Sequence, residues 1–325
     1  MATGLVSIIM VNWNSGGRLQ RGLSALAQQT YQPLEVIVVD NGSTDGSLDG
    51  IDTIYPRLRV ERNGFNAGYC RAVNQGIALS HGEYVLSLNP DVYVAPDFIE
   101  ELLAPIVTSP QIGMVCGKLF AGLGPDDGRR LDSTGLFLSR QRRPYDRGQG
   151  EEDRGQYDNH REVFGACGAA WLCRRTMLED VACDGEVLDE DFFAYYDDSD
   201  LSWRAQLRGW TCYYQPAATA WHERGGGDTL RRRSRAEKLA FAQAHAIKNR
   251  YLMILKNDDW CNLRPHLPAI LAGDLARLAY IAVRRPALLA AYREAWRLRP
   301  RALHKRRLIQ ARRLVGPAQM RRWWR

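Results

Sequence analysis

The first 100 residues alternate between strand-like and helix-like segments, and this alternation constrains the fold more than any other feature. Apolar residues at helical spacing occur within 16–30 and 67–80, which favours a helix in each range. Strands separated by helices form right-handed crossovers and a parallel sheet. The sequence therefore predicts an α/β fold with a mostly parallel sheet and flanking helices. Four segments are predicted as its strands: 5–12, 34–40, 58–63 and 83–89.

Each predicted strand ends in polar residues. Pro90 has no backbone donor for a central strand, so Asn89 and Asp91 on either side of it belong at the rim of the sheet. Turn chemistry would explain any one of these ends. In parallel sheets, however, ligands bind beyond the carboxyl ends of the strands, so four such ends at one edge favour a nucleotide site. The polar residues at the four ends are Asn12, Asn14, Asp40, Asn63, Asn89 and Asp91.

The charge of the chain is unevenly distributed. The 325 residues carry a formal net charge of +7, but residues 1–222 are acidic (net −11) and residues 223–325 are strongly basic (net +18). An acidic body with a basic tail indicates chemistry in the first part and attachment to an anionic partner in the second. The seven cysteines include no CxxC pair, which favours a reducing cytosol over a disulfide framework or a zinc site. We also find no secretory signal at the N-terminus.

Two further segments have a distinctive composition. Residues 120–165 are rich in Gly, Arg and Asp, which predicts long loops or a small hairpin. Residues 189–200 are dense in acids beside aromatic side chains, which requires either a cation or a function. The alternative is a solvated loop followed by a helix that Asp198, Ser199 or Asp200 caps and that ends at Gly209.

Seven motifs occur in the order and spacing found in the family 2 inverting glycosyltransferases, and the chain most resembles their bacterial rhamnosyltransferase-like branch, which builds cell-surface polysaccharides. The resemblance covers about residues 5–260 and implies a GT-A fold, which is Rossmann-like, together with a nucleotide-sugar donor and a divalent metal. The motifs are VSIIMVNWN, EVIVVDNGSTDGS, GFNAGYCRAVNQGI, LSLNPDVYV, GACGAAWLCRR, DEDFFAYYDDSDLSWRAQLRGW and WHERGG.

The resemblance also implies a division of the chain. Residues 1–222 would form the GT-A catalytic domain. Its nucleotide-binding half would span about 1–100 and its acceptor-binding half about 101–222. Residues 223–325 would form a basic, amphipathic helical C-terminal region.

The expected metal site consists of Asp91 and His222. Asp91 matches the metal-binding aspartate of the family's Asp-x-Asp-like motif, and His222 in WHERGG resembles its distal metal-binding histidine. Asn89 replaces the first aspartate, so we expect it to hydrogen-bond the ribose or a phosphate. A carboxylate beside an imidazole suits Mn²⁺ at least as well as Mg²⁺.

Asp198 matches the family's catalytic base. It would take the proton from the acceptor hydroxyl as that oxygen attacks the anomeric carbon opposite the leaving nucleotide, and this single displacement inverts the configuration. Asp197 replaces the usual glutamate of the pair and is the alternative base, because neighbouring acids titrate together.

The remaining resemblance concerns the donor. Asp40 would read the pyrimidine base, although Asn41 replaces a common second aspartate and leaves the base identity open. Trp13 would stack on the base or cover the strand end. Arg71 and Asn74 would reach the diphosphate or belong to a plain surface helix. The expected donor-binding residues are Asn12, Trp13, Asn14, Asp40, Asn74 and Asn89.

The basic tail predicts contact with an anionic membrane surface. The run 267–283 is 17 residues long and contains Asp274 and Arg277, so we expect an amphipathic helix, too short and too charged to span a membrane. The tail adds dense arginine together with Trp296, Trp323 and Trp324, which suits an interface with anionic lipid. The alternative is packing on the catalytic domain or on a partner subunit. No nucleic-acid recognition motif accompanies the tail.

These expectations combine into one functional hypothesis. A peripheral enzyme on the cytoplasmic face of the membrane would move a sugar, L-rhamnose from dTDP-rhamnose, to a lipid-linked or polysaccharide acceptor. One alternative is a sugar-nucleotide pyrophosphorylase, but residues 11–20 supply only a weak version of the Gly-rich basic loop that such an enzyme needs. The other alternative is a non-catalytic sugar-nucleotide-binding protein, for which Asn41 and Asn89 are the only hints.

Overall fold

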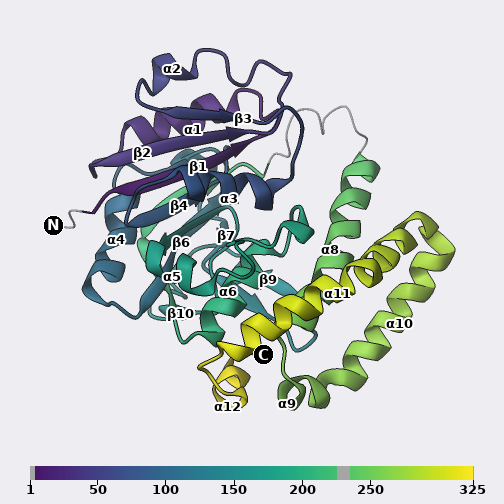
Figure 1. Ribbon diagram of the computed structural model, residues 1–325. Helices are drawn as coiled ribbons and strands as arrows, with labels where there is room; N and C mark the ends of the chain where they lie inside the picture. The colour runs from purple at the N-terminus through teal and green to yellow at the C-terminus, as the bar shows by residue number, and fades with distance from the viewer. Residues whose placement is uncertain (1–3, 225–234, 325) are drawn as a thin grey trace.

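The computed structural model describes residues 4–224 and 235–324, which form a large mixed sheet with helices on both faces and a helical C-terminal region (Figure 1). The strands are β1 (Val6–Asn12), β2 (Leu34–Asp40), β3 (Arg59–Arg62), β4 (Tyr84–Leu88), β5 (Val92–Val94), β6 (Ile112–Ala121), β7 (Leu131–Ser133), β8 (Leu136–Leu138), β9 (Pro144–Asp146), β10 (Glu162–Val163), β11 (Ala170–Arg174) and β12 (Thr211–His222). The helices are α1 (Arg18–Ala27), α2 (Ile51–Ile54), α3 (Tyr69–Leu79), α4 (Phe98–Thr108), α5 (Arg175–Val181), α6 (Asp197–Leu207), α8 (Arg235–Asn257), α9 (Trp260–Leu263), α10 (Leu267–Arg284), α11 (Leu289–Ala311) and α12 (Pro317–Met320). Short 3₁₀ turns cover Pro125–Asp127, Glu190–Phe192, Arg264–His266, Pro286–Leu288 and Arg321–Trp323.

The sheet has the strand order β10-β12-β6-β11-β4-β1-β2-β3. Strands β4, β1, β2 and β3 are parallel neighbours, whereas β11 runs antiparallel between β4 and β6. The four strands predicted in the first 100 residues are β1 to β4, so the expected mostly parallel α/β fold is confirmed. The register places Asn12 opposite Asp40 at the carboxyl ends of β1 and β2.

Strand β1 shows how the sheet builds a core on each of its faces. Val6, Ile8 and Met10 point into one apolar cluster with α1 and α4, whereas Ile9 points into the other cluster with α3, α5 and α6. Side chains of a strand alternate between the two faces of a sheet, so a strand buried on both faces reads as a continuous apolar run. This explains why the chain from Val6 to Val11 is apolar almost throughout.

The segment 120–165 contains the expected hairpin, formed by β8 and β9. Its tip is held by the C-terminal helices. Arg142 is fully buried, and its Nε donates to Asp258 Oδ2 at 2.9 Å. Arg250 Nη2 on α8 donates to the carbonyl oxygen of Gln141 at 2.7 Å. The hairpin is therefore fixed to the helical region that follows the sheet.

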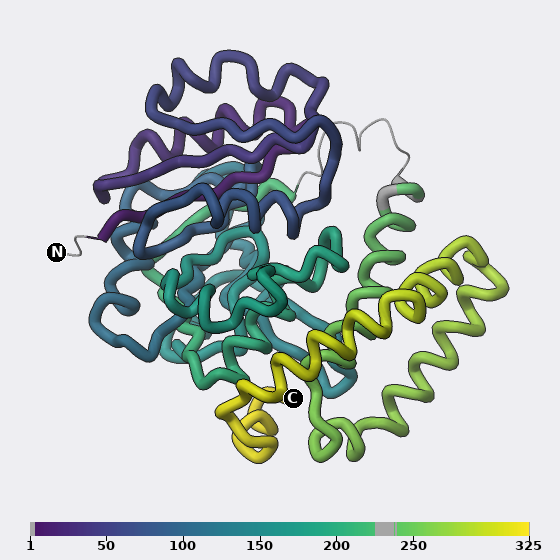
Figure 2. Tube along the Cα trace, viewed as in Figure 1, coloured from purple at the N-terminus to yellow at the C-terminus, as the bar shows by residue number. Residues whose placement is uncertain are grey.

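The C-terminal helices pack against the part of the chain that forms the sheet, and Figure 2 shows the chain running back along α11 (yellow) to the body of the molecule. The expectation that Trp323 and Trp324 contact a membrane is wrong. They are 4% and 6% exposed, because Trp324 lies with its ring centre 4.9 Å from that of Trp203, and Trp323 packs edge-on against Phe164. Only Trp296 of the three remains exposed (73%).

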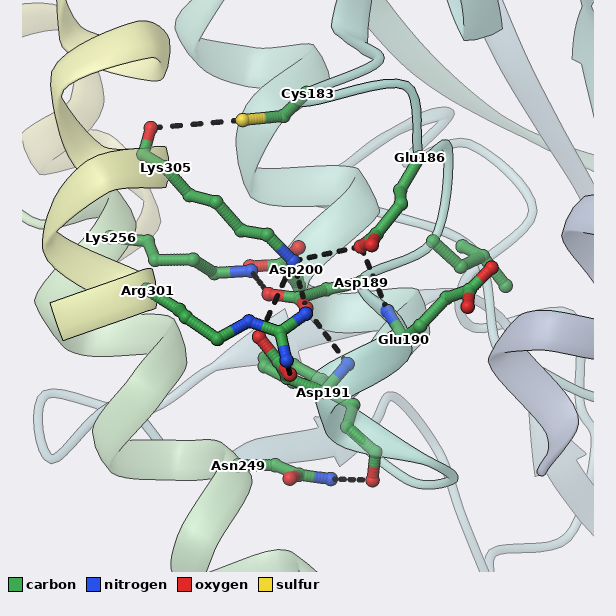
Figure 3. A network of polar contacts seen from close by, with 12 residues as sticks. Cys183, Glu186, Asp189, Glu190, Asp191, Asp200, Asn249, Lys256, Arg301 and Lys305 are labelled. Carbon is green, nitrogen blue, oxygen red and sulfur yellow. Dashed lines mark hydrogen bonds and ion pairs between the residues drawn. The ribbon is translucent and has the colours of Figure 1, made fainter. Parts of the chain in front are cut away.

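The acidic segment that begins at Asp189 is neutralised by cations from these helices (Figure 3). Asp189 is paired with Lys256 of α8 and, at 2.6 Å, with Lys305 of α11. Lys256 also lies 3.0 Å from an oxygen of Asp200, and Arg301 pairs with Asp191 at 2.9 Å. Lys256, Arg301 and Lys305 of the basic tail therefore neutralise this acidic segment. They supply the cations that the density of acids in residues 189–200 requires.

Helix α10 is the outermost helix of the C-terminal region in Figure 1. Within the described residues, one helical run, 260–284, is long and apolar enough to cross a membrane by length and composition, and 11% of its most apolar window is buried. From the sequence, the run 267–283 was expected to be too short to span a membrane. This expectation is wrong, because the helical run begins seven residues earlier, at Trp260, and is 25 residues long.

The exposed side of α10 carries no charge from Pro268 to Val283. The two charged residues in this stretch, Asp274 and Arg277, are half-buried on the opposite side, where Asp274 pairs with Arg250 of α8 at 3.0 Å. A surface helix normally places its charges outward, so α10 has the reverse arrangement. Its exposed residues there are Pro268, Ala269, Leu271, Ala272, Leu275, Ala276, Leu278, Ala279, Tyr280, Ala282 and Val283.

Candidate active site

Two adjoining pockets open at the carboxyl ends of the parallel strands. They share four lining residues: Tyr69, Asn89, Ala194 and Tyr195. The first pocket is also lined by Val11, Trp13, Ser15, Arg18, Asn41 and Asp91. The second is also lined by Tyr145, Asp146, Gly168, Tyr196, Asp198 and His222. A donor and an acceptor can therefore meet along the wall that the two pockets have in common.

Strand pairing brings Asp91 and His222 together, although they are far apart in the sequence. His222, the last residue of β12, lies opposite Val92 of β5, and the amide of Glu223 donates to the carbonyl oxygen of Asp91 at 2.9 Å. The two side chains then face each other, with 3.5 Å between His222 Nε2 and Asp91 Oδ1. The pair expected from the sequence is thus built by the register of two neighbouring strands.

Asp132 fixes the orientation of the His222 ring. His222 Nδ1 lies 2.8 Å from Asp132 Oδ2, and Arg224 pairs with the other oxygen of Asp132. Burial alone would lower the pKa of His222, but the hydrogen bonds to Asp132 and Asp91 outweigh it and raise this pKa to about 9. A carboxylate behind a histidine is the arrangement that orients histidine ligands in metal sites, because it leaves Nε2 directed at the ion.

The residues present fit a divalent cation held jointly with a substrate. Among residues 4–224 and 235–324, no group of three or more His, Cys, Asp or Glu is placed to hold a metal ion. Asp91 and His222 would supply two ligands, and the remaining positions would fall to diphosphate oxygens and water. Hard cations in phosphate-transfer sites are commonly bound in this way, by one or two protein ligands and the substrate.

Asp198 lies in the first turn of α6 and lines the second pocket. Its Oδ2 accepts from the amide of Gly168 at 2.9 Å, and its Oδ1 accepts from the amide of Ser199 at 2.6 Å. Burial raises the pKa of Asp198 in spite of these hydrogen bonds. The carboxylate is therefore held in one orientation while its basicity is increased, as a general base requires.

The two glycines of the GACG motif, Gly165 and Gly168, lie where a side chain would meet residues of α6. A Cβ at Gly168 would lie 3.2 Å from Asp198 Oδ2, and a Cβ at Gly165 would lie only 2.0 Å from Ser202 Oγ. Gly165 therefore needs glycine so that α6 can approach the segment before β11, and a side chain at Gly168 would crowd the carboxylate of Asp198. The motif brings the base and its amide donor together.

Asp197 is buried beside Asp198, and the amides of Gly168 and Ser199 donate to Asp198. Burial and the negative charge of Asp198 raise the pKa of Asp197. Two carboxylates this close cannot both ionise easily, so they take up protons as a coupled pair. Both carboxylates line the second pocket, but the amide of Gly168 fixes the position of Asp198, which favours Asp198 as the base.

The loop before Asp197 is strained and is held by α8. Phe193, Tyr195 and Tyr196 all have positive φ values (66°, 69° and 67°), a region that side chains other than glycine rarely adopt. The Asn249 amide lies within hydrogen-bond distance of three carbonyl oxygens of this segment, those of Phe192 (3.0 Å), Ala194 (2.8 Å) and Tyr195 (2.7 Å). The C-terminal region thus helps to set the conformation of the wall that both pockets share.

We expect Asn249→Ala to lower the free energy of unfolding by about 2–3 kcal/mol, because it leaves the carbonyl oxygens of Ala194 and Tyr195 in a strained loop without this donor. The turnover number should fall as well, since Asp197 and Asp198 follow this loop directly. Chemical denaturation and initial-rate kinetics would measure the two effects. Asn159→Ala changes an exposed asparagine that lines neither pocket, and it serves as the amide-to-alanine control for stability.

The structure places the expected donor residues in two groups. Trp13 and Asn89 line the first pocket, as does Asn41. Asn12 and Asp40 are buried behind it, with Asn12 Nδ2 donating to Asp40 Oδ1 at 2.8 Å. In this arrangement the Asp40 carboxylate orders the loop that follows β2, since its Oδ2 also accepts from the amide of Ser43 at 3.1 Å.

The structure does not bring Asn74 or Asn14 to a pocket wall. The Asn74 side chain binds the backbone of Leu188, just before the acidic segment. It donates to the carbonyl oxygen of Leu188 at 2.8 Å and accepts from the amide of Leu188 at 2.9 Å. Asn14 is buried and accepts from the amide of Thr44 at 2.8 Å. Arg71 is exposed on α3 and lines neither pocket. These asparagines therefore shape the loops around the site.

Sequence reasoning missed Asp132, Asp146 and Asn249. Burial, together with the charge of Asp198, raises the pKa of Asp146 to about 6, even though Ser133 hydrogen-bonds to it, and Arg224 Nη2 lies 3.6 Å from its Oδ2. Asp132 and Asp146 belong to the Gly-, Arg- and Asp-rich middle segment, where nothing distinguishes them from loop residues. Of the residues around them, only Arg224 could have been noticed from the sequence, because it belongs to the WHERGG motif. Gly225 and Gly226 of that motif lie outside the described residues.

The two pockets, the Asp91–His222 pair and Asp198 thus lie at the carboxyl edge of the parallel strands, where α/β sheets bind their ligands. The chain belongs to glycosyl transferase family 2, whose description matches residues 7–182. This confirms the resemblance and the fold inferred from the sequence, and it sets aside the pyrophosphorylase alternative.

Known relatives agree with this assignment. The chain is 28% identical over 316 residues to the N-acetylglucosaminyl-diphospho-decaprenol L-rhamnosyltransferase of Mycobacterium tuberculosis, which covers 87% of this chain and 94% of the relative. The fold of this chain is similar to that of a Pyrobaculum calidifontis mannosyltransferase in complex with GDP-Man and Mn²⁺ (TM-score 0.57, 16% identity, covering 99% of this chain and 88% of that one). GalNAc-T7 with UDP, GalNAc and Mn²⁺ is also similar (TM-score 0.56, 15% identity, 87% and 58%).

Proposed function

We propose that this protein transfers L-rhamnose from dTDP-rhamnose to a lipid-linked or polysaccharide acceptor in cell-surface glycan synthesis, with inversion at the anomeric carbon. The observation that carries the proposal is that Asp198 and His222 line one pocket, which shares a wall with the pocket lined by Asp91 and Trp13. The mycobacterial relative supports rhamnose as the sugar and a glycosyl diphospholipid as the acceptor.

The residues of the two pockets have distinct roles in this proposal. Trp13 and Asn89 bind the nucleotide part of the donor in the first pocket. Asp198, fixed by the amide of Gly168, accepts the proton of the acceptor hydroxyl in the second pocket as that oxygen attacks the anomeric carbon. Tyr69, which lines both pockets, excludes water from the point where they meet.

Asp91 and His222 would hold a divalent cation, Mn²⁺ or Mg²⁺, against the donor diphosphate. The cation, when bound, neutralises the charge that develops on the leaving nucleotide. Asp132 keeps the His222 ring turned so that Nε2 faces Asp91. The observed pairing of the two side chains is the physical basis for this assignment.

A donor screen tests the proposal. Thermal shift or calorimetry with dTDP-, UDP- and GDP-sugars, each with Mn²⁺, with Mg²⁺ and with EDTA, should show stabilisation by dTDP-rhamnose that depends on the metal. Stabilisation by a different nucleotide sugar would change the donor but keep the class of enzyme. A complete lack of stabilisation by any nucleotide would contradict the proposed function.

We further propose that the protein lies on the cytoplasmic face of the membrane, with the uncharged side of α10 in contact with lipid. The exposed Leu275 (65%) and Val283 (79%) are too apolar for a helix that faces water. Arg264 and Arg284 are exposed at the two ends of this side, where they can meet anionic headgroups. The charge complementarity at both ends favours an anionic lipid surface over a second protein.

Leu275→Glu should weaken binding to vesicles that contain anionic lipid by about tenfold or more, because it removes about 2 kcal/mol of apolar burial and adds a charge. Co-sedimentation with phosphatidylglycerol vesicles measures this effect. Val107→Glu changes a similarly exposed apolar residue on α4 and should bind as the unmodified protein does. Equal binding of both variants would contradict the proposed lipid contact.

A further inference from the structure

Three arginines from three separate segments gather beside the second pocket. Arg143 belongs to the tip of the β8–β9 hairpin, Arg250 to α8 and Arg277 to α10. The charges of all three act on the hydroxyl of Tyr196, which lines the pocket next to Asp197 and Asp198. Arg143 reaches as far as α10, since a Cβ built at Gly273 would lie 3.8 Å from its Nη2. The cluster therefore lies between the catalytic base and the uncharged side of α10.

The positive charge of this cluster is only partly balanced. Asp274 is the acid of the cluster, and Arg250 engages both of its oxygens at 3.0 Å while also donating to the carbonyl oxygen of Gln141. Within the described residues, the guanidinium groups of Arg143 and Arg277 have no hydrogen bond or ion pair to the protein, and Arg143 Nε is buried without a partner. Two cations are thus left free to bind an anion.

The environment of Arg143 shows that the arrangement has an electrostatic cost. Burial, followed by the nearby charges of Arg277 and Arg250, lowers the pKa of Arg143. Like charges held together and partly desolvated are stabilised when an anion with several acceptor oxygens binds between them. A diphosphate, with its paired oxygens, matches two guanidinium groups better than a single carboxylate does.

We propose that Arg143 and Arg277 bind the diphosphate of a glycosyl diphospholipid acceptor, with its sugar directed toward Asp198 and its lipid chain toward α10. The inference rests on the proposed function and specifies its acceptor subsite. The order along the molecule, from the base through Tyr196 and the arginines to an uncharged helix face, matches the order sugar, diphosphate and lipid in such a molecule. A polysaccharide acceptor without a diphosphate would have no use for the two cations.

Farnesyl diphosphate is a soluble probe for this subsite. Its binding is measured by calorimetry with saturating dTDP and Mn²⁺ present, so that the donor pocket and the Asp91–His222 site are filled before the probe is added. The unmodified protein should bind it about tenfold or more tightly than farnesol. Arg143→Gln and Arg277→Gln should each weaken its binding about tenfold, and Arg277→Lys should weaken it less, because it keeps the charge but loses the paired donors. Arg307→Gln changes an exposed arginine of α11 outside the cluster, and it should stay within about twofold of the unmodified protein.

Two outcomes would overturn the inference: unchanged binding of farnesyl diphosphate in both glutamine variants, or equal binding of farnesol and the diphosphate. Arg277 is half-buried on a helix surface, so its variant should fold even where Arg143→Gln does not. Metal-dependent binding of dTDP-rhamnose to the same variants separates this inference from the proposed function. If the arginine variants bind both the donor and farnesyl diphosphate normally, only the acceptor subsite is contradicted. If the unmodified protein binds no nucleotide sugar, the proposed function itself is contradicted.

Discussion

Asp198→Asn should lower the turnover number by about 10²- to 10⁴-fold and leave the affinity for dTDP-rhamnose unchanged. The amide keeps the shape of the carboxylate but cannot accept the proton of the acceptor hydroxyl. Donor binding depends on the first pocket, which Asp198 does not line. Initial rates and calorimetry with the donor measure the two quantities. A non-catalytic nucleotide-sugar sensor, in contrast, would keep its biological effect in this variant.

Asp197→Asn is the matched control for that experiment, and it should have a smaller effect on turnover with an unchanged acid limb of the pH profile. The raised pKa values of the pair mean that the base gains its proton at a higher pH than a free aspartate does. Activity therefore falls as the pH drops through this raised value. The charge of Asp198 raises the pKa of Asp197, so Asp197 still holds its proton when Asp198 titrates, and Asp197→Asn should leave the acid limb of kcat/KM in place. A larger loss of turnover in Asp197→Asn than in Asp198→Asn would reverse the assignment of the base.

Asp91→Asn should abolish the metal dependence of donor binding and reduce kcat/KM by about 10²-fold or more, since one of two protein ligands is lost. His222→Ala should have a comparable effect. Asp132→Asn acts through the His222 ring, and it should weaken metal affinity by about 10- to 100-fold while higher metal concentrations restore the activity. Titration of Mn²⁺ in thermal-shift and rate measurements distinguishes these cases.

Asp52→Asn on α2 makes the same acid-to-amide change at an exposed position away from both pockets, and it should leave metal dependence unaltered. An Asp91→Asn enzyme that retained full activity with EDTA present would show that the Asp–His pair has another role. In that case the charge of the leaving group would have to be balanced by groups such as Arg18, which lines the first pocket.

The sheet and much of the site could be predicted because their signals are local. Apolar runs gave the parallel strands, and the polar residue at the end of each run marked the edge where the pockets open. The same local reasoning could not decide what each polar residue does there. Asn12 and Asp40 are neighbours across β1 and β2, so their side chains bond to each other behind the pocket. That outcome depends on strand register, which a single run does not encode.

Contacts between distant segments were beyond the sequence. Asp132 meets His222 across 90 residues, and Asn249 holds a loop more than 50 residues before it. The basic tail was correctly predicted to be helical, but its composition could not show that Trp323 and Trp324 return to the core. Nor could it show that α10 turns its charged residues inward. Amphipathic spacing predicts that a helix has two faces, whereas tertiary packing decides which of them is exposed.

The most direct test of the account is a transfer assay with dTDP-rhamnose and an N-acetylglucosaminyl diphospholipid, followed by NMR of the product. We predict a rhamnosyl product whose anomeric configuration is opposite to that of the donor. Its formation should require Mn²⁺ or Mg²⁺ and should be lost in Asp198→Asn. A product with retained configuration, or one formed equally well by Asp198→Asn, would contradict the proposed roles of Asp198 and of the Asp91–His222 pair.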